Sequence, residues 1–236
     1  MKWGDKYGSD YVNRLYNMVN RNLTLPFDMV CLTDRREGVN PAVQCYDIPP
    51  LDLPAGSPER GWNKLSTFES DLHGLQGQAL FLDLDVVITD NIDCFFTYRP
   101  EKQFLVIHDW KRPWRITGNT SVYRFQLGAF PKVLPYFRDN FEQIRNDFRN
   151  EQAFLCDFLK KEYATLDYWP TDWCRSYKYH CLKSLPWAWW QAPACPKDAK
   201  IIIFHGEVNP PDAITGGGGK WYRHILPAPW IAEYWR

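Results

Sequence analysis

The chain has 236 residues, and its 28 lysines and arginines balance 28 aspartates and glutamates. This length suits one domain with a sizeable core, and the zero net charge argues against a polyanionic partner, so no nucleic-acid partner is expected. No stretch is long and apolar enough to span a bilayer, and the first residues do not resemble a signal peptide. Seven cysteines without a disulfide framework indicate reduced thiols, and we therefore expect a cytoplasmic protein.

The hydrophobic pattern predicts strands and helices in alternation. In chain order, strands are expected at residues 2–3, 27–33, 79–88, 104–107, 118–125 and 201–204, and helices after Ser9, at 60–75, at 132–148 and after Asn150. A strand–helix–strand opening is typical of α/β folds. We therefore predict a single α/β domain over residues 1–236, with a mostly parallel central sheet flanked by helices. Residues 206–236 are expected to form a glycine-rich loop and an aromatic tail.

Residues 79–88 carry the clearest chemical signal. An apolar run leads into Asp83 and Asp85, which stand two positions apart and so point the same way at the C-terminal end of a buried strand. Ligands of open α/β sheets bind at that end. A hard divalent cation relieves the repulsion between two such carboxylates, so the pattern predicts a Mg²⁺ or Mn²⁺ site. The alternative is a pair of aspartates that cap the next turn or face water.

Two other places could belong to a site. Arg60 and Lys64 stand at the predicted N-terminus of a helix, where a cation is unfavourable unless an anionic ligand binds. From local sequence alone, a solvated helix face is the better interpretation of these two residues. His205 ends the last buried strand, so a second apolar strand ends in a side chain that can bind metal.

The segment FLDLDVVI at 81–88, followed by NIDCFF at 91–96, resembles the DxD segment of nucleotide-sugar glycosyltransferases with the GT-A fold, and is closest to the family 8 type. The resemblance covers about residues 3–213, and only the DxD segment is individually specific. Other pieces follow in the same order, namely Asp5-Lys6-Tyr7 (the end of the first strand), Asn119–Val122 (a strand near the donor sugar), Glu151-Gln152 (an acidic–Gln pair at a helix start) and His205-Gly206 (the late metal-binding segment).

The resemblance implies that Asp83, Asp85 and His205 bind Mn²⁺ (or Mg²⁺), and that this ion binds the diphosphate of a UDP-sugar donor. It also implies retaining transfer to an acceptor that is a glycan, a lipid-linked sugar or a protein. Further donor contacts are implied for Asp5, Tyr7, Asn119 and Gly206, where Tyr7 is the aromatic residue that stacks on uracil.

Two roles within this scheme stay open. Glu151 is the candidate for a nucleophilic carboxylate, and Gln152 could instead stabilise the cationic sugar from one face. The family's late motif usually carries a lysine for the diphosphate, whereas Glu207 follows Gly206 here. The positive charge that this lysine would supply to the diphosphate is therefore expected from Arg60 or Lys64 in the donor site, or from Lys220.

Other classes of function also fit the DxD segment. It matches the DxDx[TV] motif of haloacid-dehalogenase-type phosphatases, with Asp83 as the nucleophile. That motif normally closes the first strand of its fold, whereas a strand–helix–strand unit precedes it here. A catalytically inactive nucleotide- or carbohydrate-binding protein is the remaining alternative, and the missing late lysine motivates it.

Aromatic residues are concentrated in the C-terminal half. Within residues 168–194, Trp187, Trp189 and Trp190 are expected either to line an acceptor pocket or to pack in the core. The tail at 221–236 mixes aromatic and basic side chains, which can bind a membrane surface. We expect this tail to dock onto the protein's own core, and peripheral contact with the inner face of a membrane is the alternative.

Overall fold

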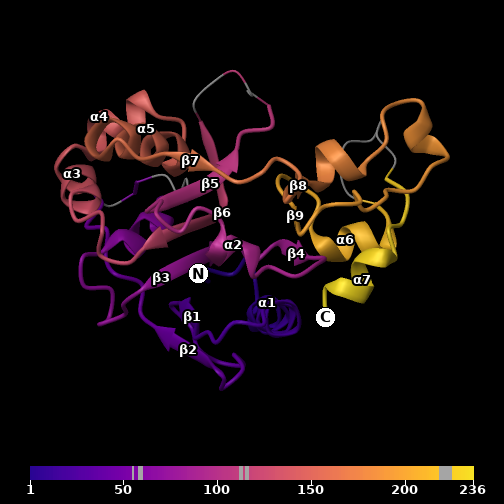
Figure 1. Ribbon diagram of the computed structural model, residues 1–236, viewed down its shortest axis with the longest axis horizontal. Helices are drawn as coiled ribbons and strands as arrows, with labels where there is room; N and C mark the ends of the chain where they lie inside the picture. Colours follow the sequence, from indigo (N-terminus) through magenta and orange to yellow (C-terminus); the bar gives the residue numbers. More distant parts are fainter. Residues whose placement is uncertain (55, 58–60, 112–113, 115–116, 218–224) are drawn as a thin grey trace.

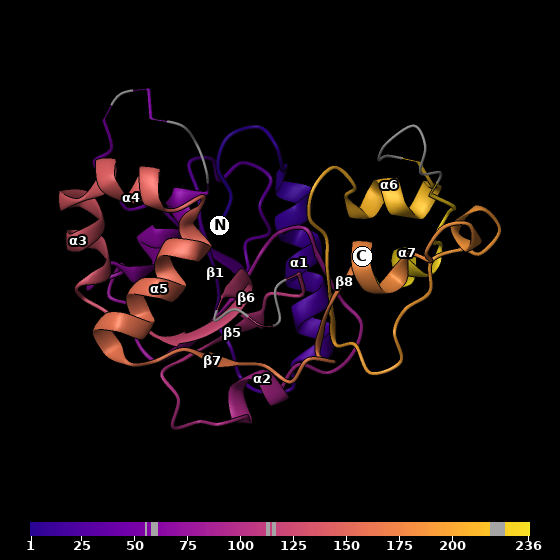
Figure 2. The same ribbon diagram turned by 90° about the horizontal axis from the view of Figure 1, so that it is seen from above.

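The computed structural model describes residues 1–54, 56–57, 61–111, 114, 117–217 and 225–236. Arg60 and Lys220, both considered above as cations for a diphosphate, lie outside this part of the chain. Figure 1 shows strands in the centre, with α3 (Val133–Asp139), α4 (Phe141–Asp147) and α5 (Glu151–Tyr163) at one end and the C-terminal third at the other. The view from above in Figure 2 gives the same order, with α1 (Ser9–Asn22) between the two ends.

The described strands form three small sheets. In the first, β1 (Met29–Leu32) pairs in parallel with β2 (Val43–Tyr46). The second has the order β3 (Gln78–Leu82), β6 (Gly118–Gln126), β5 (Phe104–His108) and β7 (Asp167–Tyr168), where β6 is antiparallel to both neighbours and β5 is parallel to β7. The third joins β4 (Val86–Ile88), β9 (Ile201–Ile203) and β8 (Cys174–Ser176), with β4 antiparallel and β8 parallel to β9.

The predicted α/β class is confirmed, but the sheets are mixed instead of mostly parallel. Periodicity identifies a buried strand without revealing its direction, and β6 returns antiparallel between β3 and β5. Residues 79–88 also form two strands instead of one, because β3 ends at Leu82 and β4 begins at Val86 in a different sheet. The turn between these two strands carries Asp83 and Asp85.

The helices cover the sheets, and the buried apolar side chains form two clusters, one that includes α1 and one that includes η1, α3, α4 and α5. Helix α1 buries Val12, Leu15 and Val19 at helical spacing, as the sequence predicts. The helix expected at 60–75 is a shorter 3-10 helix, η1 (Trp62–Phe68), and the one expected at 132–148 is broken at Asn140 into α3 and α4. The remaining described helices are short: α2 (Cys94–Thr97), η2 (Tyr177–Cys181), η3 (Trp187–Trp189), α6 (Pro210–Thr215) and α7 (Trp230–Tyr234).

Residues 225–236 of the tail dock onto α1, as expected. The Trp235 ring is buried against Tyr11, with 5.2 Å between ring centroids, and the Arg14 guanidinium lies 4.3 Å from its centroid. The Arg21 guanidinium donates hydrogen bonds to the carbonyls of Tyr234 and Arg236. Within the described residues, no helix has both the length and the apolar character needed to cross a membrane.

Arg124 on β6 ties the four-stranded sheet to the turn that follows α2. Its side chain is fully buried, and its guanidinium donates to the backbone carbonyls of Phe95, Phe96, Tyr98, Arg99 and Lys102. Carbonyls at the C-terminal end of a helix lack partners within the helix, and Arg124 supplies donors for them. The planar, five-donor guanidinium suits this role because one side chain reaches several oxygens at once.

We therefore predict that Arg124→Lys lowers the free energy of unfolding by roughly 2–4 kcal/mol, because an ammonium group leaves several buried carbonyls unpaired. Arg35→Lys is the matched control, since Arg35 is exposed and pairs with Asp5 on the surface. This control should cost less than about 1 kcal/mol. Urea unfolding measures both values, and equal losses in the two variants would contradict the role assigned to Arg124.

Candidate active site

The turn between β3 and β4 holds Asp83 against Lys64. The Lys64 Nζ atom lies 2.7 Å from Asp83 Oδ1 and 2.9 Å from Oδ2, and the two side chains are only 15% and 19% exposed. The Asp83 N–H donates to the Ser121 carbonyl on β6, which fixes the start of the turn. Burial lowers the pKa of Lys64, but the charges of Asp83 and Glu151 outweigh it, so the net pKa is raised and Lys64 is an ammonium ion.

Glu151 lies beside Lys64 in the first turn of α5. It is 7% exposed, its Oε1 accepts a hydrogen bond from Thr120 Oγ1 at 3.0 Å, and the same oxygen is 3.9 Å from Lys64 Nζ. Burial raises the pKa of Glu151, while Lys64 and Thr120 oppose that rise. One lysine therefore lies between two carboxylates in a site with little exposure to water.

Gly61 allows η1 to begin directly over Glu151. Its φ angle is +76°, which favours glycine, and a Cβ atom there would lie 3.0 Å from Glu151 Oε2. Residues 62–68 then place Lys64 one turn further along, facing Asp83. The close approach of the loop to Glu151 thus depends on a residue without a side chain.

Asp85 has a different environment from Asp83. Its Oδ2 accepts a hydrogen bond of 2.7 Å from the Tyr7 hydroxyl, which also lies 3.3 Å from Asn209 Oδ1. No lysine or arginine among the described residues forms an ion pair with Asp85. Burial, followed by the charge of Asp83, raises the pKa of Asp85 to about 6. Asp85 is therefore a carboxyl group whose charge is incompletely compensated.

His205 reaches the same edge from β9. The Phe204 N–H donates to the Asp85 carbonyl at 3.3 Å, so the backbone of His205 lies next to the DxD turn. The partner of its imidazole is Ser176 on β8, whose Oγ lies 2.6 Å from Nε2. The ring stacks on Trp110 at 5.9 Å between centroids. Burial lowers its pKa to about 4, and the imidazole is neutral at pH 7.

The three predicted metal ligands are neighbours in the backbone, but their side chains do not converge. No group of three or more His, Cys, Asp or Glu side chains is arranged to hold a metal ion within the part of the chain that the structure describes. Lys64 binds Asp83, and Ser176 binds His205, whereas Asp85 is half-buried and forms no ion pair with a described lysine or arginine. The chemistry of Asp85 fits a divalent ion, and a complete ligand set of Asp83, Asp85 and His205 stays a prediction.

The other predicted site residues have more local roles here. Asp5 is exposed and pairs with Arg35 at 2.6 Å. The Asn119 side chain accepts from the N–H of Ser121 at 3.0 Å, two residues along β6. Gln152 is half-buried, and adjacent helical residues point in different directions, so it does not share the direction of Glu151. Gly206 has a φ angle of +95°, which suits a glycine after the strand end.

Sequence reasoning missed several residues that complete these contacts. They are Thr120, which binds Glu151, Asn209, which contacts Tyr7, and Ser176 and Trp110, which hold His205. Their partners are 31 residues away for Thr120 and 202 for Asn209. A serine or threonine in a β-rich run carries no local signal of such a contact, so only the folded chain reveals them.

Comparison with solved structures shows a shared fold. The structure of the galactosyltransferase LgtC in complex with donor and acceptor sugar analogues aligns with a TM-score of 0.59 at 12% sequence identity, covering 88% of this chain and 87% of that chain. An active-site mutant of LgtC aligns with a TM-score of 0.61 at 13% identity, with the same coverage. At such low identity the likeness shows the fold alone, and it confirms the predicted GT-A-like architecture. No protein-family model matches the chain, and no curated protein matches it in sequence.

The two aspartates of the turn should respond in opposite ways to the loss of their charge. The raised pKa of Asp85 means that the folded state holds its proton between about pH 4 and pH 6 while the unfolded state has lost it, so stability falls as pH rises through this window. Asp85→Asn should therefore raise the free energy of unfolding at pH 7 by roughly 1–2 kcal/mol, with no gain below about pH 4.

Asp83→Asn is the matched comparison, because it removes the charge that compensates buried Lys64. We expect it to lower the free energy of unfolding at pH 7 by roughly 2–3 kcal/mol, since a buried ammonium loses its closest partner. Urea unfolding of both variants at pH 7 and pH 4 tests the pair. A loss of stability at pH 7 in Asp85→Asn would show that its charge is compensated after all.

Proposed function

We propose that this protein is a glycosyltransferase that moves a sugar from a nucleotide-sugar, most simply a UDP-sugar, to a carbohydrate-type acceptor. The observation that carries the proposal is the buried carboxylate–lysine group at the DxD turn. Asp83, Lys64 and Glu151 form one charged network, and Asp85, whose charge is incompletely compensated by the described residues, lies two residues further along the same turn. The fold shared with LgtC, whose structure holds donor and acceptor sugar analogues, supports this reading of the site.

In this proposal the nucleotide lies over Tyr7 and its diphosphate lies at Asp85. The Tyr7 ring is half-buried against Tyr11, with 4.7 Å between ring centroids, and its hydroxyl is held by Asp85. A ring fixed at both ends is suited to stack on a uracil base. The same contact links nucleotide binding to the orientation of the Asp85 carboxylate.

A divalent ion, Mn²⁺ or Mg²⁺, fits the site best at Asp85, with Asp83 and His205 as the further ligands that the resemblance suggests. When bound, the ion would stabilise the negative charge that develops on the diphosphate leaving group. Asp85 suits this role because it is a half-buried carboxylate without a lysine or arginine ion-pair partner among the described residues. The neutral imidazole of His205 is in the form that ligates metals, although it now binds Ser176.

Lys111 and Lys178 are our candidates for the cation that the late motif lacks. Both lysines help to lower the pKa of His205, and both ammonium groups lie over the Tyr179 ring, at 5.6 and 6.0 Å from its centroid. Lys64 is already engaged by Asp83 and Glu151. A diphosphate at this edge would therefore meet positive charge from the His205 side without breaking the Lys64–Asp83 pair.

The buried position of Glu151 favours a role in orienting Lys64 over direct attack on the sugar. A double displacement requires a carboxylate free to reach the anomeric carbon. The Glu151 carboxylate instead lies under Gly61 and accepts from Thr120. In our scheme the enzyme still retains anomeric configuration, and Gln152 at the same helix start is the alternative group for stabilising the cationic sugar.

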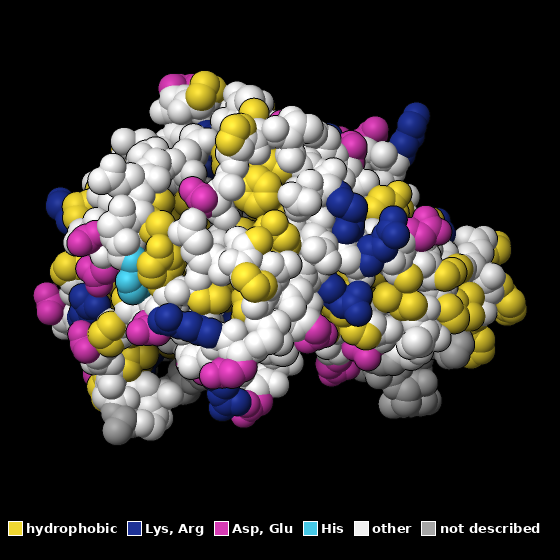
Figure 3. Space-filling view, turned by 90° about the horizontal axis from the view of Figure 1, so that it is seen from below, with side chains coloured by type: hydrophobic (Ala, Val, Ile, Leu, Met, Phe, Trp, Pro, Cys, Tyr) yellow, Lys and Arg dark blue, Asp and Glu magenta, His cyan; other side chains and the backbone are white. Residues whose placement is uncertain are grey.

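The acceptor side is proposed to lie at the C-terminal end of the molecule, where apolar side chains gather. Figure 3 shows hydrophobic surface at this end, bordered by basic side chains. The Trp187, Trp189 and Trp190 rings are 58%, 56% and 71% exposed, so these tryptophans are not core residues. Exposed indole rings stack on the faces of sugar rings, which makes this segment the candidate acceptor platform.

The first test is thermal unfolding with UDP, with Mn²⁺, and with both together. At a hundredfold excess over its dissociation constant, a ligand of the folded state adds about 2.7 kcal/mol of stability, which corresponds to roughly 5–10 °C for a chain of this size. We expect the pair to raise the melting temperature by clearly more than the sum of the separate shifts. Asp85→Asn should lose this excess, whereas the exposed control Asp90→Asn should keep it.

Absence of any shift with UDP and other nucleotides would contradict the proposal. Rapid Mg²⁺-dependent hydrolysis of p-nitrophenyl phosphate would then support the phosphatase alternative, with Asp83 as nucleophile. A nucleotide shift without transfer across a panel of UDP-sugars and acceptors would support the binding-protein alternative. Transfer activity that is lost in Asp85→Asn and kept in Asp90→Asn would complete the case for the enzyme.

A further inference from the structure

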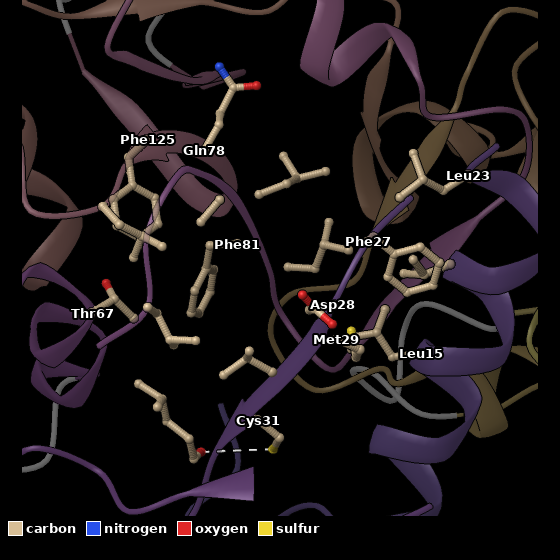
Figure 4. Close-up of a pocket in the computed structure, with 18 of the residues that line it drawn as sticks. Leu15, Leu23, Phe27, Asp28, Met29, Cys31, Thr67, Gln78, Phe81 and Phe125 are labelled. Carbon is tan, nitrogen blue, oxygen red and sulfur yellow. Dashed lines mark hydrogen bonds between the residues drawn. The ribbon is translucent and has the colours of Figure 1, made fainter. Parts of the chain in front are cut away.

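A large apolar cavity separates β1 from β3. Its volume is about 600 Å³, far more than the small voids of an ordinary protein core. Figure 4 shows Phe81 and Phe125 on one side of this cavity and Leu15 and Leu23 on the other. The walls belong to two different hydrophobic clusters, one built around α1 and the other around η1 and the four-stranded sheet.

The cavity is bounded by two strand edges, and on this side the only described backbone partner is Lys2, at the end of β1. Among the described strands, β1 pairs only with β2, and β3 pairs only with β6. Backbone groups of alternate residues point to opposite edges of a strand. On β3, the Asp83 N–H points to β6, so the amides of Leu80 and Leu82 point the other way, into the cavity. On β1, the Leu32 carbonyl points to Lys2 on the cavity side, so the amide of Val30, two residues earlier, also faces the cavity.

The N-terminal stub shows how a strand would run through this space. The Lys2 N–H donates to the Leu32 carbonyl at 2.9 Å, and Lys2 bridges Thr33 in parallel. Met1 is partly buried and lines the cavity at that end. At the other end of the cavity, Asp28 precedes β1 and Gln78 begins β3, and both side chains are exposed.

We propose that this cavity is a strand-binding slot: it takes an extended apolar segment of about five residues that is joined to Met1 and runs parallel to β1. Five residues at a rise of about 3.3 Å match the lengths of β1 and β3. Such a strand would join the two-stranded and four-stranded sheets and donate to both free edges. Its side chains would meet α1 on one face and η1 on the other, so both faces must be apolar.

The slot also bears on the candidate site, although the proposal does not depend on the proposed function. The segment that leaves the slot at Lys2 leads within five residues to Tyr7, whose hydroxyl binds Asp85. Its present pairing with the core strands is the single bridge from Lys2 to Thr33. A strand held on both edges would fix the start of this segment and so the position of Tyr7.

The test compares two versions of the chain, one with a five-residue isoleucine–valine segment fused in front of Met1 and one with a glycine–serine segment of the same length. We expect the isoleucine–valine version to melt at least about 5 °C higher. Amide hydrogen exchange should slow at least tenfold at Val30, Leu80 and Leu82. The amides of Cys31 and Phe81, which already face β2 and β6, are the internal references and should change much less.

Equal melting temperatures and equal exchange in the two versions would overturn the proposal. Uniform slowing, with the reference amides affected as strongly as Val30 and Leu80, would also overturn it, because the gain would then lie outside the slot. A third arm adds the same isoleucine–valine sequence as a free acetylated peptide. Full protection by this free peptide at micromolar concentration would overturn the joined arrangement, whereas protection only in the fused version supports it.

Discussion

The structure depends on how two half-buried carboxylates are accommodated in one three-residue turn. Asp83 and Asp85 lie where the chain leaves one sheet for another, and each loses most of its contact with water. Burying a carboxylate is costly unless a charge or several hydrogen bonds compensate it. Asp83 forms an ion pair with Lys64 on η1, and the same lysine also pairs with Glu151 on α5. Among the described residues, Asp85 has the neutral hydroxyl of Tyr7 as its hydrogen-bond partner and forms no ion pair.

This asymmetry explains several otherwise separate features. Gly61 is needed because the loop before η1 must pass close over Glu151 to deliver Lys64. Thr120 is a buried polar residue on β6 because Glu151 needs a donor besides Lys64. The break between β3 and β4 brings η1, α5, β6 and the N-terminal segment to one point, and a continuous strand over residues 79–88 would not bring the third sheet, with His205, to the same turn.

Much of this arrangement could be predicted from the sequence, for physical reasons that also set the limit. The spacing of Val12, Leu15 and Val19 predicts α1, and the apolar run before Asp83 predicts a buried strand that ends at a site. Strand direction could not be predicted, because antiparallel and parallel buried strands share the same pattern. Lys64 was recognisable as a cation in an unfavourable place, but its partner Asp83, 19 residues away, is set by tertiary packing. The orientation of the His205 ring towards Ser176 has no local sequence signal at all.

The disagreement between local rules and the folded structure is greatest at Asp85, and that has a physical meaning. A sequence selected for stability alone would place asparagine or a paired carboxylate there, since the charge of Asp85 opposes folding near neutral pH. A cation that binds the folded state at Asp85 would restore this lost stability, because it would compensate the carboxylate charge that opposes folding. The neighbouring Asp83 shows that this backbone can bring a lysine to the turn when the charge needs one. Among the described residues, no lysine or arginine forms such an ion pair with Asp85, and for this reason the proposed function places the cation of the donor complex there.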